Sequence, residues 1–198
     1  MAVLDINQHQ YNLSNRKVAI LATDGFEESE LMSPLAALKA AGANISVISI
    51  EKSAVSIRGW TEGRWSENTV TVDGTVPDTK ADSFDALMLP GGVMNPDMLR
   101  ANSDAVAFVR DFISAGKPVA AICHAPWLIV EAGAASGRRM TSYPSIRTDV
   151  TNAGATWVDE SVVTDQGLVT SRSPKDLDDF NAKMVEEFSE GAHARPHA

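Results

Sequence analysis

The sequence predicts an α/β protein with a mostly parallel central sheet. Short apolar runs alternate with segments of helical spacing from residue 17 to residue 188. Such strands pair in parallel through crossover helices, which cover both faces of the sheet. Parallel sheets of this kind place their sites at the carboxyl ends of the strands. We therefore expect the functional site where the stretches "TDGFEESE", "LPGGVMNPD" and "AICHAP" follow three of these runs.

Continuous apolar runs predict buried strands, and apolar residues recurring every three or four positions predict helices. In the first half these rules give a strand at 17–23, a helix at 27–42, a strand at 44–50, a loop with short strands at 51–83 and a strand at 84–92. In the second half they give a helix at 103–116, a strand at 118–123, a helix at 125–137, a short helix and a strand pair within 140–174 and a closing helix at 173–188.

The chain has no internal repeat and no linker between residues 16 and 190, so we predict a single domain over 16–190. Residues 1–15 are rich in Asn and Gln and predict a flexible arm, and residues 191–198 predict a loose tail. His9 lies in the arm, and His193 and His197 lie in the tail, where we expect them to be solvated rather than bound to metal.

Composition excludes several functional classes. The formal net charge of −9 argues against nucleic acid as main ligand and against an anionic membrane surface. A single cysteine excludes an intramolecular disulfide and a multi-cysteine metal site, and it fits a reducing compartment. The N-terminal stretch lacks the pattern of a signal peptide, and no apolar run is long enough to cross a bilayer. The sequence therefore predicts a cytoplasmic protein that does not enter membranes.

The single cysteine, Cys123, ends an apolar strand and precedes His124. Ala121 and Ala125 flank it at minus two and plus two, as a sharp strand-to-helix turn requires. That turn would place the thiol at a helix N-terminus, where the dipole and free N–H groups stabilise a thiolate and can hold an oxyanion. The alternative is that Cys123 is a small buried hydrophobe.

Other residues near the predicted turn also have two interpretations. His124 is either a general base or a structural histidine, and Asp97 is either its orienting carboxylate or a charge at a helix start. Gly91 and Gly92 permit a tight turn that brings backbone N–H groups near the site. The acids of "DGFEESE" either solvate the start of the next helix, or one of them turns inward as a protonated acid that hydrogen-bonds the sulfur.

The stretches "DGFEESEL", "FDALMLPGG", "GKPVAAICHAP", "GRRMTSYPSIRTDVTNAGA" and "LVTSRSPKDL" occur in that order. Together they resemble the ThiJ/PfpI superfamily, especially its PfpI-type intracellular protease and protein deglycase branch, from about residue 17 to residue 188. The resemblance implies a flavodoxin-like three-layer sandwich, similar to class I glutamine amidotransferases. The His-x-Glu pair that a glutaminase needs downstream is absent from the sequence.

The resemblance also implies roles for particular residues. Cys123 would be the nucleophile, His124 its partner, and Glu27 the acid against the thiol. Asp97, contributed by a neighbouring subunit, would complete the triad, so that the site lies at a homodimer interface, with hexamers as a further assembly. Ala125 stands where many relatives have glycine and narrows the oxyanion region. Trp127 stands where glutamine is common and changes the pocket wall.

Two functions follow as hypotheses. The first is a cysteine-dependent hydrolase, with deglycase, glyoxalase-like or peptidase action on small carbonyl adducts or peptides and a stress-protective role. In it Cys123 attacks a carbonyl, His124 moves protons, and the N–H groups of Gly91, Gly92 and His124 surround the oxyanion. The second is a redox-responsive stress protein or chaperone with little turnover, in which Cys123 is oxidised to sulfenic acid. Neither hypothesis involves a metal ion or an organic cofactor.

Overall fold

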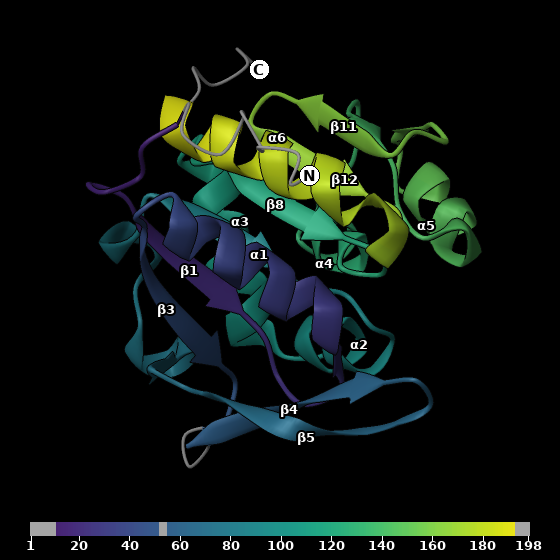
Figure 1. Cartoon of the computed structure of the whole chain (residues 1–198). Coiled ribbons are helices and arrows are strands. Elements are labelled where there is room, and N and C mark those ends of the chain that lie inside the picture. The colour runs from purple at the N-terminus through teal and green to yellow at the C-terminus, as the bar shows by residue number, and fades with distance from the viewer. Residues whose placement is uncertain (1–10, 52–54, 193–198) are drawn as a thin grey trace, which may run out of the picture.

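A computed structural model describes residues 11–51 and 55–192 (Figure 1). Its main sheet has the strand order β11-β12-β8-β7-β1-β3-β6. All neighbours in this sheet are parallel except β11 and β12, which form an antiparallel pair at one edge. The strands are β1 (Lys17–Leu21), β3 (Asn44–Ser49), β6 (Gly74–Thr75), β7 (Ala86–Leu89), β8 (Val119–Ile122), β11 (Val162–Asp165) and β12 (Leu168–Ser171).

Helices cover both faces of this sheet and give three layers (Figure 1). Alternate residues of each strand enter different cores: Ala19 and Leu21 belong to one apolar cluster, and Val18 and Ile20 to the other. The first cluster includes buried residues of α3 and α4, and the second includes those of α1 and α6. The helices are α1 (Glu28–Ala40), α2 (Met94–Arg100), α3 (Ser103–Ser114), α4 (Pro126–Glu131), α5 (Arg147–Asn152) and α6 (Leu177–Glu190). The predicted flavodoxin-like sandwich is confirmed.

The carboxyl ends of four adjacent strands carry the stretches that the sequence singled out. In the order β12-β8-β7-β1, these strands lead into Arg172, Cys123, the Pro90–Gly92 turn and the segment 22–30. The parallel register sets Ser171 beside Ile122 and Leu89 beside Ala121, so the four exits lie at one edge of the sheet. A single site can therefore form from segments that are far apart in the sequence.

The region 51–83 contains more strand than its pattern predicted. β4 (Ser56–Thr61) and β5 (Arg64–Thr71) form an antiparallel hairpin, and β4 also pairs with β2 (Phe26–Glu27). Trp60 and Trp65 face each other across this hairpin, with ring centroids 5.4 Å apart. The indole pair stabilises the hairpin. Through the pairing of β4 with β2, the hairpin in turn holds the segment that precedes α1.

Two boundaries differ from the sequence prediction. Leu13, placed in the predicted arm, is fully buried in the core, and its N–H donates to the carbonyl of Ala41 at 2.8 Å. The helix predicted over 125–137 ends at Glu131, because Gly133 and Gly137 both adopt a positive φ that breaks the helical path. In the described ranges, no helix combines the length and the apolar character of a membrane span.

Candidate functional site

The turn after β8 holds Cys123 in a strained conformation. Its φ is +66°, which residues with a side chain rarely adopt. The N–H of Cys123 donates to the Ser171 carbonyl at 3.0 Å, and the N–H of Ala125 donates back to Ile122 at 3.0 Å. Ala125 is fully buried within this turn. Backbone strain of this kind concentrates at functional sites.

The double glycine after β7 allows the backbone to pass against this turn. A Cβ on Gly91 would lie 2.6 Å from the Cβ of Cys123 and 2.7 Å from the carbonyl oxygen of Ile122, and it would also collide with the carboxyl of Glu30. Gly92 has a φ of +82°, and a Cβ there would lie 2.7 Å from the backbone nitrogen of Glu27. The two glycines therefore allow the N–H of Gly92 to lie against the sulfur, where it lowers the pKa of Cys123.

The acid at the thiol is Glu30, and the expectation of Glu27 is wrong. Glu27 is the N-cap of α1, and its carboxylate accepts from the N–H of Glu30 at 2.9 Å and from the hydroxyl of Ser29 at 2.5 Å. Glu30 lies one turn further on and is fully buried beside Cys123. Helical geometry explains the difference, because Glu27 precedes the helix and its carboxylate turns back toward the helix start.

Burial, and to a smaller extent the negative charge of Glu27, raises the pKa of Glu30 to about 8. Neither carboxyl oxygen meets strict hydrogen-bond geometry with a described residue. The Cys123 thiol and the N–H groups of Gly91 and Gly92 are nevertheless near enough to lower this pKa in part. Glu30 is therefore a protonated acid at neutral pH and can donate a hydrogen bond to sulfur.

The resting sulfur is a thiol. Burial raises the pKa of Cys123 well above its usual value, and the charge of an ionised Glu30 would raise it further. The N–H groups of Gly92 and His124 act in the opposite direction, but they do not outweigh burial. Burial therefore opposes the predicted stabilisation of a thiolate at the helix N-terminus, because Cys123 is only 5% exposed and α4 is short.

His124 contacts the sulfur directly. Its Nδ1 lies 3.2 Å from Sγ of Cys123, and its Nε2 lies 3.1 Å from the hydroxyl of Ser145. The ring of Tyr143 stacks on the imidazole with a centroid distance of 4.7 Å and an interplanar angle of 22°. Burial lowers the pKa of His124, so the imidazole is neutral at neutral pH and can accept a proton.

Asp97 does not contact His124 of its own chain. It lies in α2, is largely exposed, and accepts from both Nε and Nη2 of Arg100 at 2.9 and 2.7 Å. The Arg100 guanidinium lies over the Trp127 ring, 4.3 Å from its centroid. Trp127 also lies 5.2 Å from the His124 ring and donates its indole N–H to Asp149 at 2.7 Å. Trp127 is therefore placed beside the imidazole, whereas Asp97 within this chain is an ion-pair partner.

Asn95 connects two of the strand exits and was not singled out from the sequence. It is fully buried, accepts from the N–H of Thr23 at 2.8 Å, and donates to the carbonyls of Pro90 and Gly91 at 2.8 and 3.3 Å. Its amide therefore fixes the double-glycine turn against the end of β1. An asparagine directly before a proline, three residues after the double glycine, was the available signal, since buried amides commonly satisfy loop backbone groups.

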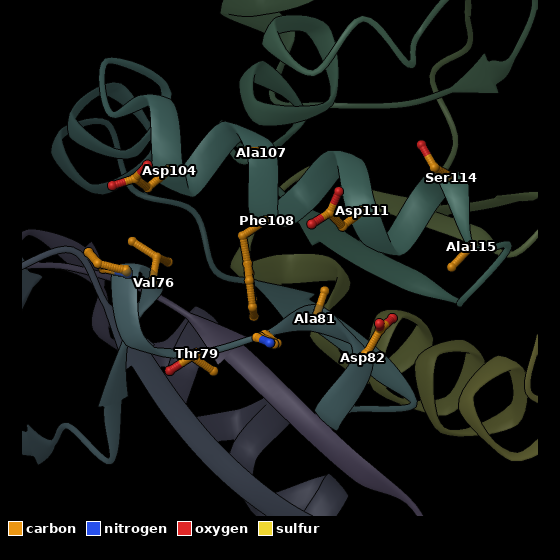
Figure 2. A pocket seen from close by; sticks show the side chains of 12 residues that line it. Val76, Thr79, Ala81, Asp82, Asp104, Ala107, Phe108, Asp111, Ser114 and Ala115 are labelled. Carbon is orange, nitrogen blue, oxygen red and sulfur yellow. The ribbon is translucent and has the colours of Figure 1, made fainter.

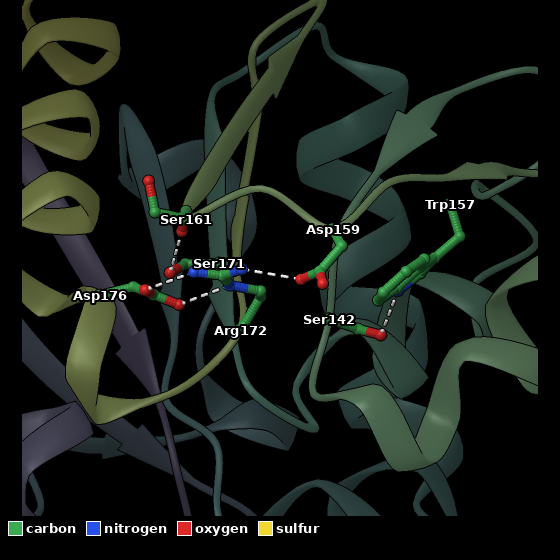
Figure 3. A network of polar contacts seen from close by, with 7 residues as sticks. All are labelled: Ser142, Trp157, Asp159, Ser161, Ser171, Arg172 and Asp176. Atoms are coloured by element: carbon green, nitrogen blue, oxygen red, sulfur yellow. Dashed lines mark hydrogen bonds and ion pairs between the residues drawn. The ribbon is translucent and has the colours of Figure 1, made fainter.

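Arg172 fixes the fourth strand exit (Figure 3). Its Nε and Nη2 donate to the two carboxylate oxygens of Asp176, both at 2.9 Å, and its Nη1 donates to Asp159 at 2.7 Å. The neighbouring Ser171 hydroxyl donates to the Ser161 carbonyl at 2.7 Å. These bonds hold the end of β12. They therefore also hold the Ser171 carbonyl, which accepts the hydrogen bond from the N–H of Cys123.

A separate cavity of about 580 Å³ lies between α3 and the segment 76–82 (Figure 2). Asp104 and Asp111 border it from α3, Asp82 from the facing segment, and Phe108 extends between them. None of the residues predicted for the site lines this cavity. Within the described part of the chain, no group of three or more His, Cys, Asp or Glu side chains is arranged to hold a metal ion.

Comparison with known proteins gives consistent matches. The sequence profile described as the DJ-1/PfpI family matches residues 16–187. "Protein/nucleic acid deglycase 2" of Escherichia coli K12 is 45% identical over 86% of this chain and 96% of its own length. "General stress protein 18" of Bacillus subtilis is 44% identical over 86% and 96%. A two-domain Anabaena variabilis protein with DJ-1/ThiJ/PfpI-like and ferritin-like domains superposes with a TM-score of 0.81 at 36% identity, over 86% of this chain and 47% of that one.

Proposed function

The chain belongs to the DJ-1/PfpI family, and on that premise we propose that it is a cysteine-dependent hydrolase of deglycase type with a stress-protective role. The observation that carries the proposal is the contact between Cys123 Sγ and His124 Nδ1, at 3.2 Å, on a turn with positive φ. A thiol beside a neutral imidazole becomes nucleophilic when the imidazole takes its proton. The substrate classes are small carbonyl adducts and peptides.

In the proposed first step the Cys123 sulfur forms a bond to the carbonyl carbon while its proton passes to Nδ1 of His124. The carbonyl oxygen becomes an oxyanion, and the N–H groups of Gly92 and His124, which lie at the sulfur, are the donors we assign to it. Gly91 provides the close backbone approach. Glu30 replaces Glu27 as the acid that hydrogen-bonds the sulfur, and Trp127 lies beside the imidazole as a pocket wall.

The net charge of the protein favours some classes of adduct over others as substrates. The E. coli relative is named for both protein and nucleic acid. At a formal net charge of −9, this chain repels a phosphate backbone. We therefore propose adducts on proteins, amino acids or small thiols as the substrates.

We further propose a homodimer with the site at its interface. Three exposed apolar side chains support it: Val93 and Met98 around α2, and Tyr143 above His124, are 56%, 42% and 40% exposed. Asp97 of a second copy reaching the site, and a hexamer, stay predictions. Light scattering on wild type, Met98→Asp and the control Val55→Asp, an exposed residue of the hairpin segment, tests the dimer. Only Met98→Asp should shift toward the monomer mass.

The experiment for the activity is turnover of methylglyoxal-treated N-acetyl amino acids and of peptides by wild type, Cys123→Ser and Ser136→Ala, matched for purity. Wild type and the exposed Ser136→Ala control should turn over equally, and Cys123→Ser should lose activity. Equal rates in all three would show that a contaminant is responsible and refute the proposal.

Oxidation is the second candidate, because a protonated Glu30 beside the thiol can also hydrogen-bond a sulfenate. Wild type that forms a sulfenic acid at Cys123 with peroxide, but turns over no adduct or peptide, would favour this role over hydrolysis.

A further inference from the structure

The hydroxyl of Ser145 contacts the ring nitrogen of His124 that does not face the Cys123 thiol. Nε2 of His124 lies 3.1 Å from Ser145 Oγ, and Nδ1 lies 3.2 Å from Sγ of Cys123. A neutral imidazole carries one proton, so one ring nitrogen donates and the other accepts. The nitrogen that donates to Ser145 leaves the other free to accept from the thiol.

The segment that carries Ser145 is tied to the cysteine turn. The N–H of Tyr143 donates to the carbonyl of Cys123 at 2.8 Å, and the N–H of Ile146 donates to the carbonyl of Tyr143 at 3.1 Å. Ser145 lies in a short 3₁₀ turn, Pro144–Ile146. The hydrogen bond between Tyr143 and Cys123 therefore holds this turn next to the nucleophile. The Tyr143 ring stacks on the imidazole and restricts its rotation.

The protonation states around the sulfur favour one direction for these contacts. Glu30 is a protonated acid beside the sulfur, and Cys123 is a thiol. If Nδ1 carried the imidazole proton, it would point at the sulfur and could not accept the thiol proton. An Nε2–H that donates to Ser145 Oγ instead leaves the Nδ1 lone pair facing the thiol, so the S–H can donate to it. The hydroxyl proton of Ser145 is then free to meet solvent, since Ser145 is exposed.

Building on the proposed function, we propose that Ser145 is a positioning residue that accepts the hydrogen bond of His124 Nε2–H and so keeps Nδ1 unprotonated to receive the Cys123 proton. In that transfer the S–H bond breaks, an Nδ1–H bond forms, and the products are a thiolate and an imidazolium. Ser145 Oγ stays the acceptor of Nε2–H throughout.

The first test reads the histidine tautomer by nitrogen-15 NMR of histidine-labelled protein, with His124 assigned through His124→Gln. In wild type the proton should be on Nε2. Ser145→Ala should move both ring-nitrogen shifts toward each other as the Nδ1–H form gains population, and Ser145→Thr should restore the wild-type shifts. Thr148→Ala removes an exposed hydroxyl three residues along the chain and should change nothing. A proton on Nδ1 in wild type overturns the inference.

The second test is the pH profile of Cys123 alkylation by iodoacetamide, followed by mass because the chain has one cysteine. A neutral hydrogen bond corresponds to a factor of about three to ten, so Ser145→Ala should be slower by that factor near neutral pH. Ser145→Thr and Thr148→Ala should match wild type. A Ser145→Ala rate equal to wild type overturns the inference. Absence of adduct turnover by wild type, with the tautomer shift intact, would instead refute only the proposed function.

Discussion

Glu30 makes the stability of this protein fall as pH rises. Its pKa is about 8 in the folded chain, against an ordinary value of 4.5, mainly because the carboxyl is buried. The folded state therefore binds more protons than the unfolded state between these two values. The stabilisation from neutral Glu30 is complete below the unfolded pKa and is lost as pH rises toward the folded pKa.

The size of this effect follows from the two pKa values. Between about pH 5.5 and about pH 7.5, the Glu30 contribution to the free energy of unfolding should fall by about 2–3 kcal/mol. Glu30→Gln keeps the shape of the protonated acid and cannot ionise, so it should lack this decrease. The pKa of His124 is lowered in the folded chain, so the His124 contribution to the free energy of unfolding rises with pH, opposite to that of Glu30. Both proteins contain His124, so its contribution cancels in their difference.

The assay is urea denaturation of wild type, Glu30→Gln and Glu67→Gln at both pH values. Glu67 is an exposed acid of β5, so Glu67→Gln makes the same Glu-to-Gln exchange without changing a buried group. The stability difference between Glu30→Gln and wild type should shift by about 2–3 kcal/mol in favour of the variant at the higher pH. Glu67→Gln should track wild type. Parallel pH dependence in all three proteins would refute the assignment of a protonated, buried Glu30.

The remaining predictions concern the scaffold of the site, and urea or thermal denaturation checks each of them. Asn95→Ala leaves the buried Thr23 N–H and the Pro90 carbonyl without their partner, so it should cost about 1–3 kcal/mol for each orphaned group; an unchanged midpoint would contradict this. Leu13→Ala should cost about 2–5 kcal/mol because Leu13 is fully buried, whereas a true arm residue would cost almost nothing. Gly91→Ala places a methyl group 2.6 Å from the Cβ of Cys123, so little folded protein should form, and a stable, active variant would refute the close approach.

The sequence located the reactive turn because backbone geometry there depends on local residue types. Ala121 and Ala125 around Cys123 predicted a sharp turn, and its positive φ confirms the sharpness. The strand order brought the Pro90–Gly92 turn beside it, as expected for the carboxyl ends of adjacent parallel strands. Features set by the order of strands and by small residues were therefore predictable.

The acid at the thiol was not predictable, because it depends on where α1 begins. "FEESE" offers acids at positions 27, 28 and 30, and helix boundaries from sequence are uncertain by a few residues. Glu27 became the N-cap, a position that Ser, Thr, Asp and Asn usually occupy, so the usual capping rules did not mark it. Ser145 was missed for a different reason: its contact with His124 spans 21 residues and depends on the 3₁₀ turn after Tyr143.

The resting site carries no net charge at its centre, and this determines how it can react. Glu30 is protonated, Cys123 is a thiol and His124 is neutral at neutral pH, since burial disfavours the charged form of each. A preformed thiolate–imidazolium pair would oxidise and alkylate readily without substrate, because the thiolate is the reactive form. Here the proton must move from sulfur to Nδ1 as the substrate carbonyl arrives, when an oxyanion gives the Gly92 and His124 N–H groups a charge to stabilise. Reactivity at Cys123 is therefore coupled to a bound electrophile, and the orientation of His124 controls it.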